Sequence, residues 1–216
     1  FLVSEQMLNI CVDPGPILLE PSSKNTAPSI LASCFFEFNR NKEAILIVVP
    51  SDHLIDDVSV FHQSLKSGLP AVQNGKFVCL GVTPQSPDTG FGYLEIGDAK
   101  SEAFVEVVQF LEKPDHSNAP KMSSSGRHLW NAGIFMFRAK DMIDAFQKYQ
   151  PNMRAVVKHS VEQADLDLGF IRLDPSKWDA MANISIDYAI MEKTDNLVAL
   201  PLSLSWSDLG SWNSVV

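Results

Sequence analysis

The chain has 216 residues and a formal net charge of −9 at pH 7, with 45% apolar and 20% charged residues. This length suits one domain with a substantial core, and the composition is typical of a globular protein rather than a disordered one. The negative charge argues against a nucleic-acid partner, because phosphate backbones require clustered Lys and Arg, but small phosphorylated ligands stay open. No apolar run reaches about 18 residues, so no membrane span is predicted.

The three cysteines and the first six residues give evidence on the cellular compartment of the protein. Cys11, Cys34 and Cys79 are odd in number and widely spaced, with no CxxC pair. This pattern favours buried thiols in a cytoplasmic protein over a zinc site or a disulfide framework. Residues 1–6 include an acid and no basic leader, which argues against a signal peptide.

Short apolar runs alternate with helical patterns along the chain, which indicates an α/β fold with a largely parallel sheet. Residues 16–19 predict a short strand. Residues 26–38 predict a helix with Asn25 or Thr26 as its N-cap. Residues 44–49 (AILIVV) are continuously apolar, as expected of a central parallel strand buried on both faces.

The rest of the chain continues this alternation. The segment from residue 90 to 114 holds two predicted strands, GFGYLEIG and FVEVVQFLEKP, separated by a polar turn at residues 98–102. The other predicted strands are 77–82, 130–137 and 197–202, and the predicted helices are 59–72, 141–149, 153–163 and a stretch around 186–192.

Two acids follow predicted strands at opposite ends of the chain. Asp52, in VVPSDH, lies just beyond the strand at residues 44–49, where ligands bind in open α/β sheets. Asp208, in WSDLGSW, follows another strand and precedes Gly210, which permits a tight turn. Carboxylates together with substrate phosphates suit Mg²⁺, so the pair is a candidate metal site. Taken singly, each acid could equally be a structural residue, Asp52 as a helix cap and Asp208 in a turn.

Two further segments are candidates for binding a phosphorylated ligand. In FLEKP, Lys113 could bind a phosphate and Glu112 sugar hydroxyls, although such a pair is usually a solvated strand edge. In EPSSKNTAP, the start of a helix offers exposed N–H groups. Glu20 could there accept two hydrogen bonds from the N1–H and 2-amino group of guanine. A capped helix after a turn would explain the same residues.

Seven segments in this order resemble the mannose-1-phosphate guanylyltransferases (GDP-mannose pyrophosphorylases), in particular the bacterial type. The resemblance covers essentially the whole chain and rests on EPSSKNTAP, VVPSDH, GFGY, FLEKP, WNAGIFMF, SIDYAIMEK and WSDLGSW. NTAP, WNAGIF and SIDYAIMEK favour mannose and guanine over relatives that handle glucose or thymidine. The resemblance implies a Rossmann-like nucleotide-diphospho-sugar transferase fold, with a mixed, mostly parallel sheet flanked by helices. Residues 1–216 would form a partial catalytic domain, incomplete at both ends.

The resemblance also implies roles for individual residues. Asp52 and Asp208 match the two aspartates that hold the catalytic Mg²⁺, and Lys113 matches the lysine on the sugar phosphate. The expected sugar ligands are Glu112, Asn131 and, through its backbone, Gly92, with Asp187 in a family motif of less defined role. The expected base-recognition residues are Glu20, Asn25 and Thr26. His53 is interpreted as structural, because a sugar phosphate is already anionic at neutral pH and needs no general base.

The chain departs from the family by lacking its glycine-rich loop with an Arg and a Lys, which follows the first strand and wraps the triphosphate. The resemblance implies that the first strand is missing too, and its absence should leave an exposed sheet edge that favours a homodimer or aggregation. The predicted reaction is in-line attack of mannose-1-phosphate on the α-phosphorus of GTP, giving GDP-mannose and pyrophosphate. A catalytically silent module that binds a sugar phosphate or nucleotide sugar is the alternative, as is the same chemistry on another hexose-1-phosphate or base.

Overall fold

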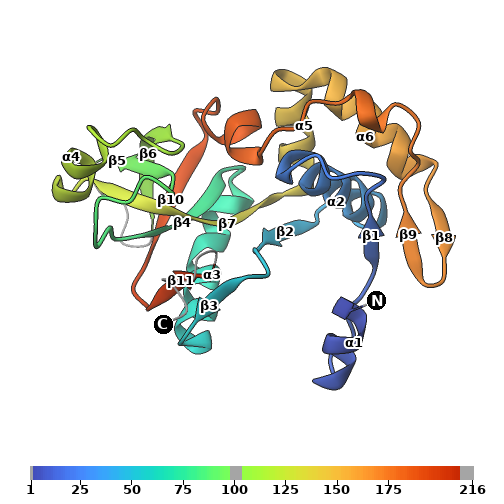
Figure 1. The fold of residues 1–216 in the computed structure, drawn as a ribbon, viewed down its shortest axis with the longest axis horizontal. Helices are drawn as coiled ribbons and strands as arrows, with labels where there is room; N and C mark the ends of the chain where they lie inside the picture. The colour runs from blue at the N-terminus through green and yellow to red at the C-terminus, as the bar shows by residue number, and fades with distance from the viewer. Residues whose placement is uncertain (1, 98–103, 210–216) are drawn as a thin grey trace.

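The computed structural model describes residues 2–97 and 104–209, which form a mixed six-stranded sheet, two smaller sheets and flanking helices (Figure 1). The large sheet runs in the order β2 (Ile45–Val48), β7 (His128–Arg138), β4 (Phe77–Val82), β10 (Leu197–Leu202), β6 (Val105–Leu111) and β5 (Tyr93–Ile96). β5 also pairs with the first residues of β7, so that β7, β4, β10, β6 and β5 close a ring of pairings. β10, late in the chain, lies between β4 and β6.

Strand direction is where the fold differs from the sequence prediction. In the described part of the chain, β4 with β10 is the one parallel pair of the large sheet. A mixed sheet with flanking helices is confirmed, and the prediction that it is mostly parallel is wrong. Along β4, Phe77 and Cys79 face the core beneath one helical layer, while Val78 and Leu80 face the core beneath α3. A continuous apolar run therefore reports burial on both faces and not strand direction.

The predicted central strand at residues 44–49 is also corrected. It forms β2, which runs antiparallel to β7 and lies at the edge of the sheet. Ile47 is 45% exposed and Val49 is 52% exposed. Ile47 in β2 and Val49 just after it are thus partly exposed at this edge, where β7 pairs with one side of β2 and no described strand pairs with the other.

The predicted helices are confirmed, with ends shifted by at most two residues. α2 (Thr26–Arg40), α5 (Ala139–Tyr149) and α6 (Pro151–Glu162) pack together on one side of the sheet, and α3 (Val58–Gln73) packs on the other. Asn25 is the N-cap of α2, and its side chain accepts the Thr26 N–H at 2.9 Å. The stretch around residues 186–192 is a π-helix, η2 (Asp187–Met191).

The predicted strands are found as β1 (Ile17–Leu19), β4, β5, β6, β7 and β10, and the predicted turn at 98–102 lies outside the described residues. Sequence reasoning missed several short elements. These are α1 (Leu2–Asn9), β3 (His53–Ile55), α4 (Ala119–Ser124), β8 (Asp165–Asp167), β9 (Phe170–Arg172), the 3-10 helix η1 (Trp178–Ala180) and β11 (Trp206–Asp208). The small sheets are β1–β9–β8 and β11–β3. Among the described helices, none combines the length and the apolar character needed to cross a membrane.

Candidate functional site

Four of the predicted sugar-site residues lie together where β5, β6 and β7 meet. The carbonyl oxygen of Gly92 accepts the Asn131 backbone N–H at 2.8 Å. A Cβ atom on Gly92 would lie 2.5 Å from the Glu112 Oε2 atom and 3.4 Å from the Asn131 Cβ atom. The Asn131 Nδ2 atom donates to Asp187 Oδ1 at 3.0 Å. Glycine at position 92 therefore lets two polar side chains approach one backbone segment closely.

The amide of Asn131 is held in one orientation. Its Oδ1 atom accepts the Gly133 backbone N–H at 2.8 Å and the Cys79 thiol at 3.1 Å. Burial raises the pKa of the Cys79 thiol well above its usual value, so the sulfur keeps its proton and donates. With Asp187 accepting from Nδ2, the second N–H of the Asn131 amide is left for another acceptor.

Glu112 is an unusual carboxyl group for a strand end. Burial, the negative charge of Asp187 and that of Glu192 raise its pKa to about 7, although Lys113 opposes this shift. The Glu112 Oε2 atom is buried and has no hydrogen-bond partner among the described residues. The Lys113 Nζ atom lies 4.0 Å from Glu112 Oε1, and the lysine side chain is 61% exposed. This carboxyl group is thus placed to accept a hydroxyl donor from a ligand.

The two predicted metal ligands lie at the same end of the short β3–β11 ladder, where Asp52 directly precedes β3 and Asp208 ends β11. Asp208 is the last residue of β11 and pairs with His53 of β3, the neighbour of Asp52. The Leu209 N–H donates to the Asp52 carbonyl oxygen at 2.9 Å, which ties the two segments together. Asp208 was predicted to follow a strand and instead ends one. Gly210, the predicted turn residue, lies outside the described residues.

His53 is held by an aromatic partner rather than left free for proton transfer. Its Nδ1 atom accepts the Trp206 Nε1–H at 3.1 Å. Burial lowers the His53 pKa, and the negative charges of Asp52 and Asp208 partly oppose this shift. One ring nitrogen of His53 is thus engaged with Trp206, and the structural role of His53 stays a prediction.

An aromatic chain connects the acid pair to the sugar-site residues. The Trp206 ring centroid lies 5.2 Å from that of His53 and 5.4 Å from that of Phe91. Phe91 in turn contacts Trp130 at 5.0 Å between centroids. Because Phe91 precedes Gly92 and Trp130 precedes Asn131, this packing fixes the two groups of residues relative to each other.

Two of the predicted base-recognition residues make hydrogen bonds that hold the start of α2, and the third has a side-chain oxygen without a partner. Thr26 Oγ1 accepts the Ile186 N–H at 2.9 Å, which joins the start of α2 to η2, and Asn25 caps α2. Glu20 has a buried Oε1 atom without a partner among the described residues, and burial raises its pKa. Glu20 is therefore the one of these three residues with a buried side-chain oxygen that has no hydrogen-bond partner among the described residues.

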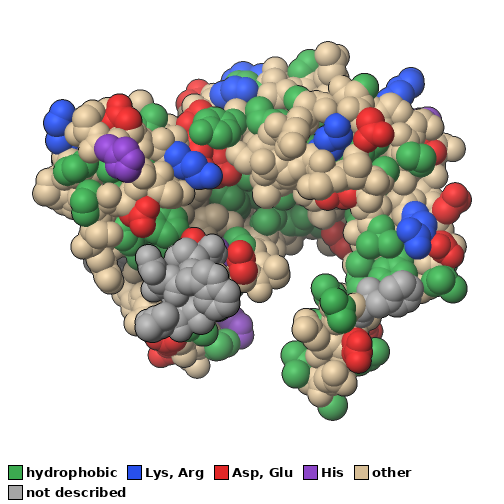
Figure 2. All heavy atoms as spheres, viewed as in Figure 1, with side chains coloured by type: hydrophobic (Ala, Val, Ile, Leu, Met, Phe, Trp, Pro, Cys, Tyr) green, Lys and Arg blue, Asp and Glu red, His purple; other side chains and the backbone are tan. Residues whose placement is uncertain are grey.

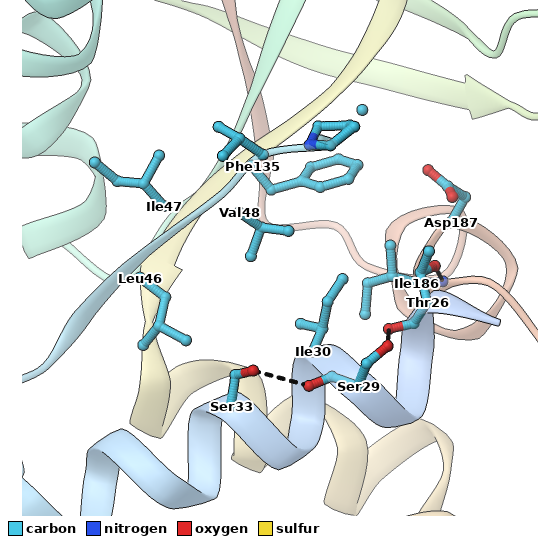
Figure 3. Close-up of a pocket in the computed structure, with 13 residues that line it drawn as sticks. Thr26, Ser29, Ile30, Ser33, Leu46, Ile47, Val48, Phe135, Ile186 and Asp187 are labelled. Carbon is cyan, nitrogen blue, oxygen red and sulfur yellow. Dashed lines mark hydrogen bonds between the residues drawn. The ribbon is translucent and has the colours of Figure 1, made fainter. Parts of the chain in front are cut away.

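A cavity of about 520 Å³ lies beside these groups, between α2, β2, β7 and η2. Figure 3 shows Thr26, Ile186 and Asp187 on one side of it and Leu46 and Ile47 on the other. Ser29 and Ser33 of α2 also line a second hollow of about 350 Å³ that includes Glu20. In Figure 2 this face of the molecule is hollowed, with hydrophobic side chains at the floor. Thr26 and Asp187, one from the predicted base site and one from the predicted sugar site, thus line the first cavity, and Glu20 lines the second.

Comparison with known proteins identifies the family. A family model described as "Nucleotidyl transferase" matches residues 10–216. The chain belongs to the nucleotidyl transferases. It is 38% identical over 224 aligned residues to "Mannose-1-phosphate guanylyltransferase 2" of Escherichia coli O157:H7, covering 100% of this chain and 46% of that protein. It is 37% identical to "Xanthan biosynthesis protein XanB" of Xanthomonas campestris, again over 100% of this chain and 46% of the relative.

A solved structure has a similar fold. The structure titled "Crystal structure of mannose-6-phosphate isomerase from Helicobacter pylori" superposes with a TM-score of 0.87 at 31% sequence identity. The match covers 96% of this chain and 81% of that one. The chain spans about half the length of the curated relatives that it matches.

Sequence reasoning did not single out two residues that contact the candidate site. Cys79 is buried in the core, as predicted, and its thiol also donates to Asn131 from 52 positions away in the chain. Glu192, within SIDYAIMEK, accepts the Glu112 backbone N–H at 3.0 Å. The only sequence signal for Glu192 was its place in a motif that resembles the family, since a contact across 80 residues leaves no local pattern.

Proposed function

We propose that this nucleotidyl transferase chain serves the transfer of a guanylyl group from GTP to mannose-1-phosphate, with GDP-mannose and pyrophosphate as products. The observation that carries the proposal is the cluster of Gly92, Glu112, Asn131 and Asp187 beside the cavity bordered by α2 and β2. The named activity of the Escherichia coli relative supports mannose-1-phosphate and a guanylyl donor. Residues 1–216 would then be a partial catalytic domain.

Each group of residues has one task in this proposal. Glu112 and Asn131 accept and donate hydrogen bonds to sugar hydroxyls, Gly92 gives the hexose access to the backbone, and Asp187 orients Asn131. Lys113 holds the sugar phosphate with its exposed ammonium group. Glu20, with Asn25 and Thr26 shaping the start of α2, recognises the guanine base.

Mg²⁺ is the metal that fits the acid pair. Among residues 2–97 and 104–209 no cluster of three acidic, histidine or cysteine side chains could hold a metal by itself. Mg²⁺ commonly binds one or two protein carboxylates and completes its coordination shell with substrate phosphates and water. Two carboxylates, those of Asp52 and Asp208, are therefore enough protein ligands for Mg²⁺. When bound there, the metal would supply neutralisation of the phosphate charge.

The chemistry asks little covalent work of the protein. An oxygen of the sugar phosphate forms a bond to the α-phosphorus of GTP, and the bond from that phosphorus to the bridging oxygen breaks as pyrophosphate leaves. The attacking oxygen is already anionic and needs no general base, and the Nδ1 atom of His53 is engaged with Trp206. The residues act by positioning the reactants in line and by neutralising charge.

A coupled pyrophosphate-release assay with GTP and mannose-1-phosphate tests this function directly. In the same assay, Asp208→Asn should lower turnover by about 100-fold or more, because one metal carboxylate is replaced by a neutral amide. Asp167→Asn on the distant strand β8 is the matched control and should leave turnover unchanged. Near-normal turnover of the Asp208→Asn protein would rule out the metal role.

One observation favours the silent binding module as the second candidate. Among the described residues whose charges shift the pKa of Glu112, Lys113 is the one cation and lowers that pKa, while Asp187 and Glu192 are acids and raise it. A triphosphate carries several negative charges and would find few cations here. Calorimetry separates the two functions, since the silent module binds GDP-mannose without releasing pyrophosphate from GTP. Comparing mannose-1-phosphate with glucose-1-phosphate, and GTP with other nucleotides, separates the remaining alternatives.

We also propose a homodimer, formed through the unpaired edge of β2, and a cytoplasmic location. The prediction of buried thiols is confirmed for Cys34 and Cys79 and is wrong for Cys11, which is exposed; all three cysteines are free, which suits a reducing compartment.

A further inference from the structure

The turn after β6 holds Lys113 in an unusual backbone conformation. The ladder between β5 and β6 ends at the pair of Tyr93 and Leu111, so Glu112 and Lys113 lie beyond the last paired residues. Lys113 has a φ of 50°, in the left-handed region that side chains other than glycine rarely adopt. It also precedes Pro114, and a residue before proline normally has an extended conformation. Such a turn requires contacts that hold it in place.

Glu192 supplies that contact from another part of the chain. Its Oε1 atom accepts the Glu112 backbone N–H at 3.0 Å, which gives a partner to an amide that has left the β5–β6 ladder. Glu192 caps the C-terminal end of η2, and its own N–H donates to the Asp187 carbonyl oxygen at 3.0 Å. Ala189, Ile190 and Met191 are buried, so η2 is a fixed platform.

We propose that Glu192 is a positioning residue that holds the Glu112–Lys113 turn and thereby sets the place of the Lys113 ammonium group. The same short π-helix then serves both halves of the sugar-phosphate site: Asp187 orients the Asn131 amide, and Glu192 fixes the turn with the lysine. Single-turn π-helices occur frequently at functional sites, where they redirect side chains that a regular helix would space differently. The consequence for ligand binding rests on the proposed function.

The test combines two substitutions of Glu192 with a matched control. Glu192→Gln keeps an oxygen acceptor for the Glu112 N–H, whereas Glu192→Leu removes it. Glu162→Leu changes an exposed glutamate at the end of α6, far from the site in sequence. Mannose-1-phosphate and GTP are varied separately in the pyrophosphate-release assay, and mannose-1-phosphate binding is measured by calorimetry.

We expect Glu192→Leu to raise the KM and Kd for mannose-1-phosphate on the order of tenfold, because the lysine that meets its phosphate is no longer held. The KM for GTP should change less than about twofold, and Glu192→Gln should stay within about threefold of the unmodified chain. The Glu162→Leu control should match the unmodified chain. Equal losses for Gln and Leu, or equal losses for both substrates, would overturn the positioning role.

A readout independent of catalysis separates this proposal from the proposed function. In ¹⁵N-labelled protein, the Glu112 amide proton should resonate downfield in the unmodified chain and in Glu192→Gln, and shift upfield in Glu192→Leu. An unchanged resonance in Glu192→Leu shows that the hydrogen bond does not hold the turn and overturns the proposal. If the unmodified chain binds no mannose-1-phosphate, the proposed function fails, and the resonance alone then decides the role of Glu192.

Discussion

At the scale of single residues, Glu112 links the protein's stability to pH. Its pKa of about 7 in the folded state lies above the ordinary value of 4.5. Between these values the folded state retains a proton that the unfolded state has released. The resulting stability is full below pH 4.5 and is lost as the pH rises through about 7.

Glu112→Gln removes this dependence. We expect the melting temperature of the unmodified chain to fall relative to that of Glu112→Gln as the pH rises from about 4.5 to about 7, and the difference to level off above that range. Thermal unfolding followed by circular dichroism over a pH series measures it. Parallel curves for the two proteins would show that Glu112 has an ordinary pKa. Glu162→Gln, an exposed glutamate of α6, is the control.

Gly92 tests the geometry of the same cluster. In Gly92→Ala the new methyl group would meet Glu112 Oε2 at 2.5 Å, so the carboxyl group must move. We expect the overpacked methyl group to cost about 1 to 3 kcal/mol of stability. We also expect mannose-1-phosphate affinity to fall by about tenfold or more, because Glu112 is displaced. Gly97→Ala is the matched control, because its methyl group would meet nothing closer than 3.4 Å. Calorimetry with equal losses in both variants would contradict this geometry.

Sequence reasoning reached some of these residues and not others for a physical reason. Asp52 and Asp208 end or follow strands, and Glu112 and Lys113 follow one, so strand boundaries made them candidates and the resemblance to the family gave them roles. Cys79 and Glu192 act through contacts that the fold creates, across 52 and 80 residues respectively. Neither contact has a local sequence pattern, and both required the tertiary structure.

At the scale of secondary-structure elements, two substitutions of Asn25 at the start of α2 distinguish the loss of a helix cap from the relief of backbone strain. Asn25 accepts the Thr26 N–H with its side chain and has φ 66° and ψ −165°, a region that is essentially restricted to glycine. Asn25→Ala loses the cap and keeps the strain, so we expect it to lose about 1 to 2 kcal/mol of stability. Asn25→Gly relieves the strain and should stay within about 0.5 kcal/mol of the unmodified chain. Urea unfolding measures both, and an equal loss in both variants would show that the backbone is unstrained.

The elements also show which sequence signals were reliable. Helix ends were predicted well because caps and amphipathic spacing are local properties, as at α2 and α3. Strand direction was predicted wrongly because an apolar run such as β4 looks the same whether its neighbours are parallel or antiparallel. Short strands such as β3 and β11 were missed because they exist through their pairing with each other.

At the scale of the whole molecule, the open edge of β2 is an expected site of self-association. β2 pairs only with β7 among the described strands, and its apolar side chains are partly exposed. Unpaired strand edges recruit other strands, and a charge on the edge suppresses this. We expect Ile47→Lys to weaken self-association by about tenfold or more in sedimentation velocity. Val108→Lys, on the internal strand β6 with a 63% exposed side chain, should have little effect. Similar weakening by both would locate the association elsewhere.

The central place of β10 has a consequence for how the protein is made. β10 joins β4 to β6, and its residues come from the last part of the described chain. During synthesis, β4, β5, β6 and β7 leave the ribosome well before the strand that lies between β4 and β6. The sheet therefore cannot be completed until Leu197–Leu202 has been synthesised, and until then β4 and β6 lack the strand that pairs with both of them.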